Sequence, residues 1–316
     1  MNRYAPEGNY IIRPENREIL ASPEGIARAL ERGDILESVA RVCDEEMTLH
    51  FDLGCMEGIM PRDEVQYTHH GEPVKDIAVL TRVGKPVCFK VIGFTRGEGG
   101  RATAVLSRRA AQAECRECFI ADLRPGDLIP ARITHLEGFG AFVDIGCGIV
   151  SLLSIDAISV SRISHPSDRF AVGDRIFCLV RRIDDDGRIY VTHRELLGTW
   201  EENAALFSPG QTVAGTVRSI ESYGIFVELM PNLAGLAEAR PGVAVGDSAA
   251  VYIKSIIPEK MKIKLIIIDS HPAPPERDIT YFVDTVACAH INHWRYSPPS
   301  AQKLIETVFC EDAQEI

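Results

Sequence analysis

Two aromatic residues, Phe139 and Phe142, stand three positions apart in a run that reads Phe-Gly-Ala-Phe-Val. In a regular strand such residues point to opposite faces, so we expect a bulge at Gly140 to bring the rings together. Two adjacent rings form a platform on which any unpaired base can stack. Arg188 follows an Asp-Asp-Gly turn, where a cation can pair with a phosphate or stack on a base. These residues indicate a site for single-stranded nucleic acid, although the same rings could instead belong to a core and Arg188 to a solvated strand end.

Five short runs of β-branched and apolar residues surround these positions, separated by Gly, Pro, Asp and Ser. The predicted strands are Leu128–His135, Phe139–Ile145, Ile149–Ser154, Arg175–Ile183 and Arg188–Thr192. Five strands within so short a segment predict a small closed barrel of the OB type.

The order of these features resembles the RNA-binding domain named after ribosomal protein S1. The matching elements are Gly126, Phe139–Val143, Gly173-Asp174 and Asp184–Ile189. The resemblance implies that Phe139, Phe142, Asp184 and Arg188 contact RNA. Ser154 stands at the position where the family usually has a third-strand His, and it is counted among the expected RNA-binding residues.

Residues 210–268 repeat this plan. Tyr223 and Phe226 stand at the positions that correspond to Phe139 and Phe142. Lys262 stands at the position that corresponds to Arg188. A Lys keeps the charge but lacks the planar fork of Arg, and the third-strand position is Glu238. We therefore expect a weaker RNA site here.

Residues 33–108 form a more degenerate repeat, in which Leu53–Ile59 corresponds to Ile145–Ile149. Asp44, Glu45 and Glu46 stand in place of the aromatic pair. Because carboxylates repel phosphates, we expect this repeat to fold as a barrel without binding RNA on that face, and to be available for packing or for docking a protein partner.

The predicted fold class is all-β, with three tandem five-stranded OB-type barrels joined by short helices and a small α-containing C-terminal extension. Capping signals predict helices at Pro23–Arg32 and after Thr199, and an amphipathic helix after Ser297. The expected boundaries are an N-terminal arm and helix (1–32), a degenerate barrel (33–108), a linker helix (109–125), the RNA-binding barrel (126–197), a second linker helix (198–209), the third barrel (210–268) and the extension (269–316).

The chain has 316 residues, 46% of them hydrophobic, with a net charge of −11 and nine cysteines. Neither a run of about 18 apolar residues nor a signal-peptide pattern is present, so a soluble cytoplasmic protein with reduced thiols and no membrane partner is expected. An acidic chain cannot attract RNA by its overall charge. Binding must depend on local cations and on stacking.

No arrangement of residues typical of an enzyme is present, and we expect neither a catalytic residue nor a cofactor. Asp184 and the two acids after it lie in a tight turn, where solvation is a better explanation than metal binding. Cys115 and Cys118 form a single CxxC without a second pair, which is a weak metal signal, so no metal is expected.

These expectations lead to a functional prediction. The chain should bind single-stranded RNA, most simply mRNA, in translation beside the small (30S) ribosomal subunit, as a short factor similar to ribosomal protein S1. Two alternatives remain: an accessory subunit that recruits RNA for a degradation or transcription complex, and a scaffold whose aromatic pairs are buried in protein partners.

Overall fold

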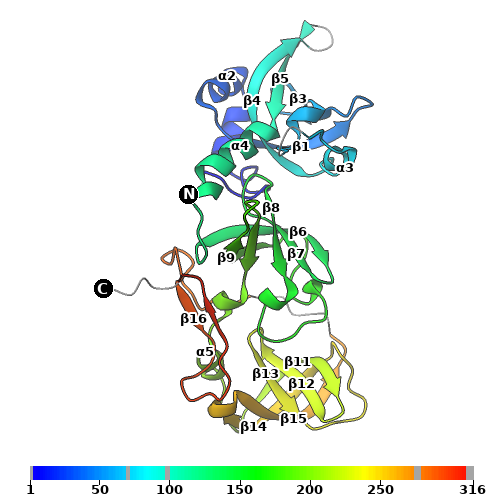
Figure 1. The fold of residues 1–316 in the computed structure, drawn as a ribbon. Coiled ribbons are helices and arrows are strands. Elements are labelled where there is room, and N and C mark those ends of the chain that lie inside the picture. Colours follow the sequence, from blue (N-terminus) through cyan, green and yellow to red (C-terminus); the bar gives the residue numbers. More distant parts are fainter. Residues whose placement is uncertain (1–2, 69–71, 97–99, 274–278, 311–316) are drawn as a thin grey trace, which may run out of the picture. The chain divides into compact units, whose positions relative to one another are not determined.

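The computed structural model describes residues 3–68, 72–96, 100–273 and 279–310. Most of its elements are strands, and all but two of the described strands form three closed five-stranded barrels (Figure 1). The chain divides into two compact units. The first comprises Met1–Leu123 with Asp144–Val150, and the second comprises Arg124–Val143 with Ser151–Ile316. None of the described helices is both long and apolar enough to span a membrane.

The first unit opens with two helices, α1 (Pro14–Leu20) and α2 (Pro23–Arg32). The hydroxyl of Ser22 caps α2 by accepting a hydrogen bond from the Gly25 amide, and Gly33 ends it in the left-handed conformation at φ +65°. The predicted helix is confirmed at both ends.

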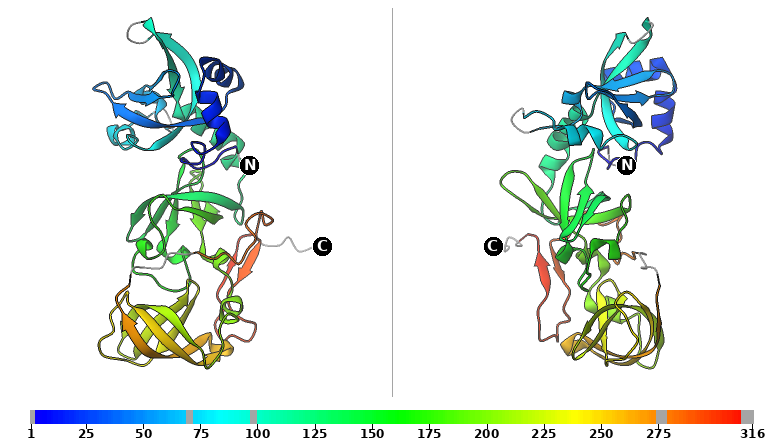
Figure 2. Two further views of the ribbon diagram at one scale, coloured as in Figure 1. Left: turned by 180° about the vertical axis from the view of Figure 1, so that it is seen from behind. Right: turned by 90° about the vertical axis from the view of Figure 1, so that its right-hand side faces the viewer.

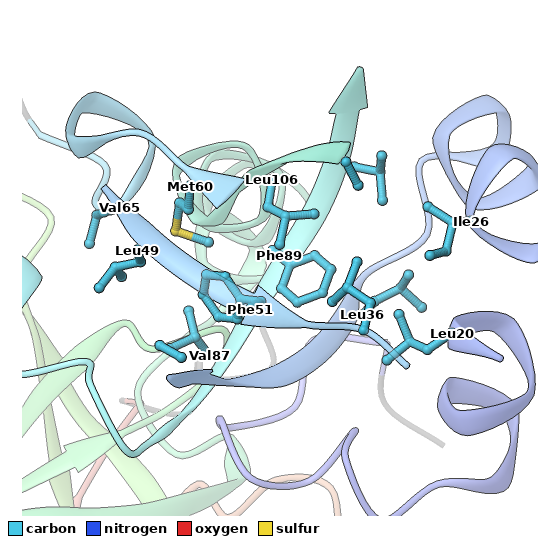
Figure 3. Close-up of a cluster of buried hydrophobic side chains, with 14 of the residues drawn as sticks. Leu20, Ile26, Leu36, Leu49, Phe51, Met60, Val65, Val87, Phe89 and Leu106 are labelled. Carbon is cyan, nitrogen blue, oxygen red and sulfur yellow. The ribbon is translucent and has the colours of Figure 1, made fainter. Parts of the chain in front are cut away.

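The first barrel has the strand order β1-β2-β3-β5-β4. Its strands are β1 (Leu36–Cys43), β2 (Leu49–Asp52), β3 (Glu57–Met60), β4 (Pro86–Arg96) and β5 (Ala102–Ser107), with η1 (Arg62–Glu64) and α3 (Asp76–Leu80) between β3 and β4. Phe51 and Phe89 meet in its core with ring centroids 5.8 Å apart, and Leu20 and Ile26 of the two helices pack against the same cluster (Figure 3). The degenerate repeat thus has a complete apolar core of its own.

Helix α4 (Arg108–Cys118) follows β5 directly, and a short 3-10 helix, η4 (Ile120–Asp122), comes after it. Ser107 caps α4 through a hydrogen bond from the Ala110 amide to its hydroxyl. Cys115 is buried while Cys118 is exposed, so the two thiols of the CxxC do not face a common site. All nine cysteines are free thiols.

The central barrel has the order β10-β8-β7-β6-β9, closed by the parallel pairing of β8 with β10. Its elements are β6 (Leu128–Glu137), β7 (Gly140–Asp144), β8 (Val150–Ser154), η5 (Ile155–Ala157), η6 (Pro166–Asp168), β9 (Arg175–Ile183), β10 (Ile189–Thr192) and η7 (Arg194–Leu197). The five predicted strands are confirmed, with ends displaced by two residues at most.

Helix α5 (Trp200–Ala204) joins the central and third barrels. Its predicted capping box is confirmed: Thr199 accepts from the Glu202 amide, and Glu202 accepts from the Thr199 amide. The third barrel has the order β11-β12-β13-β15-β14. Its elements are β11 (Thr212–Glu221), β12 (Gly224–Met230), β13 (Leu233–Ala237), β14 (Ser248–Ile257), η8 (Pro258–Lys260) and β15 (Lys262–His271).

The C-terminal extension corrects one expectation. Instead of a helix after Ser297, the described part of the extension has a hairpin of β16 (His293–Arg295) and β17 (Glu306–Val308). The Ser297 hydroxyl donates to the Lys303 carbonyl and accepts from the Ile305 amide. These backbone groups therefore have their hydrogen-bond partner within the hairpin loop and not in a helix. Trp294 and Tyr296 pack into the core of the third barrel, and the hairpin runs beside α5 (Figure 2).

A buried charge cluster links the central and third barrels within the second unit. Arg169, from the loop after β8, forms a bidentate pair with Glu228 of β12, and Arg218 of β11 forms a second one. Glu228 is 6% exposed and Arg169 is 3% exposed. Beside this cluster the side-chain oxygen of Asn232 accepts from the Val160 amide, and its side-chain nitrogen donates to the Arg194 and Gly198 carbonyls.

We predict that Glu228→Gln destabilises the second unit by about 3–5 kcal/mol, because the substitution leaves Arg169 buried without its counter-charge. Arg218 still has Asp168 at 3.8 Å, so Arg169 carries most of the cost. Urea unfolding followed by circular dichroism measures the loss. Glu221→Gln, at the exposed end of β11, is the matched control and should change stability by less than about 0.5 kcal/mol. Equal effects of the two substitutions would contradict the assignment.

A second prediction concerns His193, which is fully buried after β10. Its Nδ1 bonds to the Ile158 carbonyl and its Nε2 to the Tyr281 hydroxyl, an arrangement that fits the neutral ring. Burial lowers the pKa of His193 to about 4. The unfolded chain therefore binds a proton that the folded chain does not between that value and the ordinary His pKa of about 6.5, so stability falls as the pH drops through this window.

Lowering the pH from 7.5 to 5 should reduce the free energy of unfolding by about 2 kcal/mol through this residue. Urea unfolding at the two pH values measures the change. The variant His193→Gln should lose this part of the pH dependence. A pH dependence that is unchanged in the variant would assign the effect to other groups.

Candidate nucleic-acid interface

The two aromatic rings of the central barrel lie side by side. Phe139 is 57% exposed, Phe142 is partly buried, and their ring centroids are 6.0 Å apart with the planes at 89°. This edge-to-face contact is a preferred geometry for aromatic pairs. It holds one ring perpendicular to the other at the barrel surface, with Phe139 as the more exposed of the two.

The structure gives Gly140 a different role from the bulge expected there. Phe139 lies in the turn before β7, so the alternation of a strand does not apply to it. Its carbonyl accepts a hydrogen bond from the Ile155 amide at 2.9 Å. A Cβ at Gly140 would lie 2.5 Å from the Leu153 carbonyl oxygen, so only glycine allows β7 to start this close to β8.

A third ring, which sequence reasoning missed, extends the pair. His135 in β6 is exposed and stacks on Phe142, with centroids 6.3 Å apart and planes at 26°. Its Nε2 bonds to Glu137 at 2.7 Å. The signal that could have identified His135 was its position near the end of β6, where the alternation of buried residues stops after Ile133.

Ser154 ends β8 and bonds to a cation rather than standing alone. The Arg181 guanidinium donates to the Ser154 hydroxyl at 3.3 Å and lies 3.4 Å from the Asp156 carboxylate. Burial opposes ionisation of Asp156, but the Ser154 hydroxyl and the Arg181 charge hold its pKa below the ordinary value. A charged group therefore does reach the position of the absent His.

Asp184 and Arg188 flank the turn between β9 and β10. The Asp184 amide donates to the Arg188 carbonyl, while the Asp184 carboxylate pairs with Arg182. The Arg182 guanidinium carbon in turn lies 3.7 Å from the centroid of the Tyr190 ring. Arg188 is exposed just before β10, which β8 separates from β7. Arg182 and Tyr190 were not expected in this cluster, but they face each other in the β9–β10 register.

The third barrel reproduces the aromatic pair. Tyr223, in the turn before β12, is 67% exposed and lies 6.1 Å from Phe226 at an interplanar angle of 88°. Gly224 repeats the role of Gly140, since a Cβ there would lie 2.5 Å from the Ala237 carbonyl oxygen. The same local device thus produces the same geometry in both barrels.

Cross-strand pairing adds a cation that the alignment of repeats did not single out. Phe226 pairs with Leu236, and Leu236 pairs with Lys264 of β15. Lys264 therefore lies in the same row across the sheet as Phe226. Lys262, the residue expected from the sequence, is exposed two positions away along β15. The exposed alternate positions of β15 were the signal that could have identified Lys264.

The corresponding face of the first barrel is acidic. His50 of β2 lies between Asp44, at 2.8 Å, and Glu57, at 3.0 Å. Hydrogen bonds to Asp44 first and then to Glu57 raise the pKa of His50. Met47, in the hairpin turn, has φ +61°. Within the described residues, no group of three or more His, Cys, Asp and Glu side chains is arranged to hold a metal ion.

Comparison with known proteins adds to this geometry. Residues 122–194 match the family model described as the S1 RNA binding domain. The central barrel therefore matches the S1 RNA-binding domain along its length. The family resemblance inferred from the sequence is thereby confirmed for this part of the chain.

The chain is also similar to curated proteins named small ribosomal subunit protein bS1. It is 27% identical over 237 residues to that of Rhizobium meliloti, covering 68% of this chain and 39% of the relative. It is 30% identical over 234 residues to that of Mycobacterium tuberculosis (69% and 46%) and 31% identical over 191 residues to the homolog of Bacillus subtilis (58% and 47%). The chain thus spans less than half the length of these relatives.

Proposed function

We propose that this chain binds single-stranded RNA through the aromatic pairs of its central and third barrels, without catalysing a reaction. The observation that carries the proposal is the repeated edge-to-face pair, with centroids 6.0 Å apart in one barrel and 6.1 Å apart in the other. Stacking on such rings tolerates any base, which suits an mRNA-binding protein. The match of the central barrel to the S1 RNA binding domain supports this proposal.

The place of action in this proposal is translation, at the small ribosomal subunit in the cytoplasm. The names of the curated relatives support it. The first barrel, whose corresponding face has His50 between two carboxylates, is proposed to contact protein rather than RNA. Sedimentation of the full-length chain with and without small ribosomal subunits tests this part. Co-purification with nuclease or RNA polymerase subunits, and not with ribosomes, would favour a role in RNA degradation or transcription.

The two aromatic pairs should contribute unequally. The central pair has His135 against Phe142, and the same barrel carries Arg181 and Arg182 on β9 and Arg188 just before β10, while the third barrel has lysines in place of arginine forks. Stacking on one ring contributes about 1–3 kcal/mol per base, so Phe142→Ala should weaken binding to single-stranded RNA about tenfold or more. Phe226→Ala should cost less.

Fluorescence anisotropy with a labelled oligonucleotide measures both losses. Phe94→Ala, an exposed Phe of β4 in the first barrel, is the matched control and should leave affinity unchanged. Equal losses from Phe142→Ala and Phe226→Ala would overturn the ranking, and no loss from either would overturn the proposed site.

The salt dependence of binding should be shallow, because the chain is acidic and few phosphates can be neutralised. Each phosphate contact to a single strand changes the slope of log affinity against log salt by about −0.7, and we expect a total magnitude of roughly 1 to 3. Lys264→Gln should reduce that magnitude by about 0.7. A slope as steep as that of a basic nucleic-acid-binding protein would contradict the stacking model.

A further inference from the structure

The first unit contains a pocket whose walls include three arginines. Arg82 comes from the turn after α3, and Arg108 and Arg116 come from the two ends of α4. The other described residues that line it are Gln66, Tyr67, Ala78, Gln112, Gly148, Ile149 and Val150, none of which carries a carboxylate. All ten belong to the same compact unit. The pocket differs in composition from the aromatic pairs, because it is lined by cationic side chains and not by exposed rings.

One of the three arginines is already neutralised. Arg108 is 4% exposed, and its guanidinium forms a bidentate pair with Glu7, with Nε to Oε1 at 2.7 Å and Nη2 to Oε2 at 3.1 Å. It also donates to the Val65 and Gly148 carbonyls. Burial opposes ionisation of Glu7, but the charge of Arg108 keeps its pKa below the ordinary value. This pair therefore builds the wall of the pocket and contributes little net charge.

The other two arginines lack an equal counter-charge. Arg82 reaches the same Glu7 carboxylate only at 3.4 Å, and Arg116 makes no ion pair with any residue in the described ranges. The Arg116 guanidinium carbon instead lies 5.3 Å from the centroid of the Tyr67 ring. The Nε atoms of Arg82 and Arg116 are both buried, with no hydrogen-bond partner among the described residues. Burying charge in this state is costly, and an anion would relieve the cost.

The remaining nearby carboxylate does not remove this excess. Asp144 is occupied by the amides of Glu7, Gly146 and Gly148, at 2.7, 2.8 and 3.0 Å. Burial first, and then the charge of Glu7, raise the pKa of Asp144 above its ordinary value, which weakens it as a counter-charge. Arg82 shows the same imbalance, since burial and the charge of Arg108 lower its pKa.

The size of the pocket limits what can fill it. Its volume is about 260 Å³, below the roughly 300–1,000 Å³ of sites for drug-sized ligands. It can hold a phosphate with an adjoining sugar but not an extended strand of RNA. Guanidinium groups match the oxygens of phosphate in charge and geometry better than any other side chain.

We propose that this pocket binds a phosphomonoester dianion, with Arg82 and Arg116 as its ligands and the Arg108–Glu7 pair as a fixed wall. Such a group occurs on a nucleoside monophosphate and on the 5′ end of a processed RNA. Both sources offer the same chemistry to the two arginines, and the experiment separates them.

The test is isothermal titration calorimetry on the full-length chain with inorganic phosphate, adenosine 5′-monophosphate and adenosine. We expect saturable binding of the two phosphates and none of adenosine. Arg116→Gln should weaken phosphate binding at least tenfold, and Arg82→Gln should do the same. Arg109→Gln is the matched control, because Arg109 is an exposed residue of the same helix that pairs with Glu64. It should leave binding unchanged.

Two further arms complete the design. Short RNAs with a 5′-phosphate or a 5′-hydroxyl are compared by anisotropy. A tenfold preference for the 5′-phosphate that is lost in Arg116→Gln assigns the site to RNA ends, while binding of the mononucleotide without that preference assigns it to a small metabolite. The double variant Phe142→Ala/Phe226→Ala should keep its phosphate binding, so failure of the stacking sites is distinguishable from failure of this one.

Folding of the variants is followed by thermal unfolding. If Arg82→Gln unfolds the first unit, Arg116→Gln and the charge-preserving Arg116→Lys decide the result, because Arg116 is only partly buried and makes no ion pair with the described residues. Absence of saturable phosphate binding by the unaltered chain, or equal binding by it and by a folded Arg116→Gln, would overturn the proposal.

Discussion

The close approach of two backbones at a glycine determines the candidate interface in both the central and the third barrel. At Gly140 and Gly224 the start of one strand comes so near the carbonyl of the next that a Cβ would lie 2.5 Å from its oxygen. This contact places the preceding aromatic residue in a turn, from which its side chain meets the ring three positions later. A larger residue at either glycine would move the turn and separate the rings.

Buried arginine–carboxylate groups have a second organising role, and they differ in what they leave available. In the second unit Glu228 accepts from both Arg169 and Arg218, so one carboxylate faces two cations in a site that also ties loops of two barrels together. In the first unit Glu7 is shared mainly with Arg108, and Arg82 and Arg116 remain with little compensation. The first arrangement is closed by its own residues. The second lines a pocket and is the reason that we infer a ligand there.

The three barrels share a strand plan but differ in what their corresponding faces carry. The central barrel has three rings and arginine forks, the third has two rings and lysines, and the first has His50 between two carboxylates. A barrel core requires only buried apolar alternation, which all three have, whereas stacking requires exposed rings. Folding and binding therefore make separate demands on the same strands, and one repeat can lose the second property without losing the first.

The spacing of the aromatic residues indicated that Phe139 meets Phe142 and that Tyr223 meets Phe226, although the contact that brings them together is the backbone approach at Gly140 and Gly224. The sequence by itself determined the number and type of barrels, the five strands around Phe142, and the capped helices at Pro23 and Trp200. These features depend on residue alternation, glycine punctuation and caps, all of which act over a few neighbouring positions.

Only the tertiary structure decided the rest, because pairing across strands and packing between segments leave no periodic trace in the chain. His135 joined the platform through its neighbour across the sheet, Lys264 joined the row of Phe226 through β13, and the residues after Ser297 formed a hairpin because their backbone groups found partners across it. Likewise Glu7 and Arg108, 101 positions apart, came together through burial, where a charge is stable only beside its opposite.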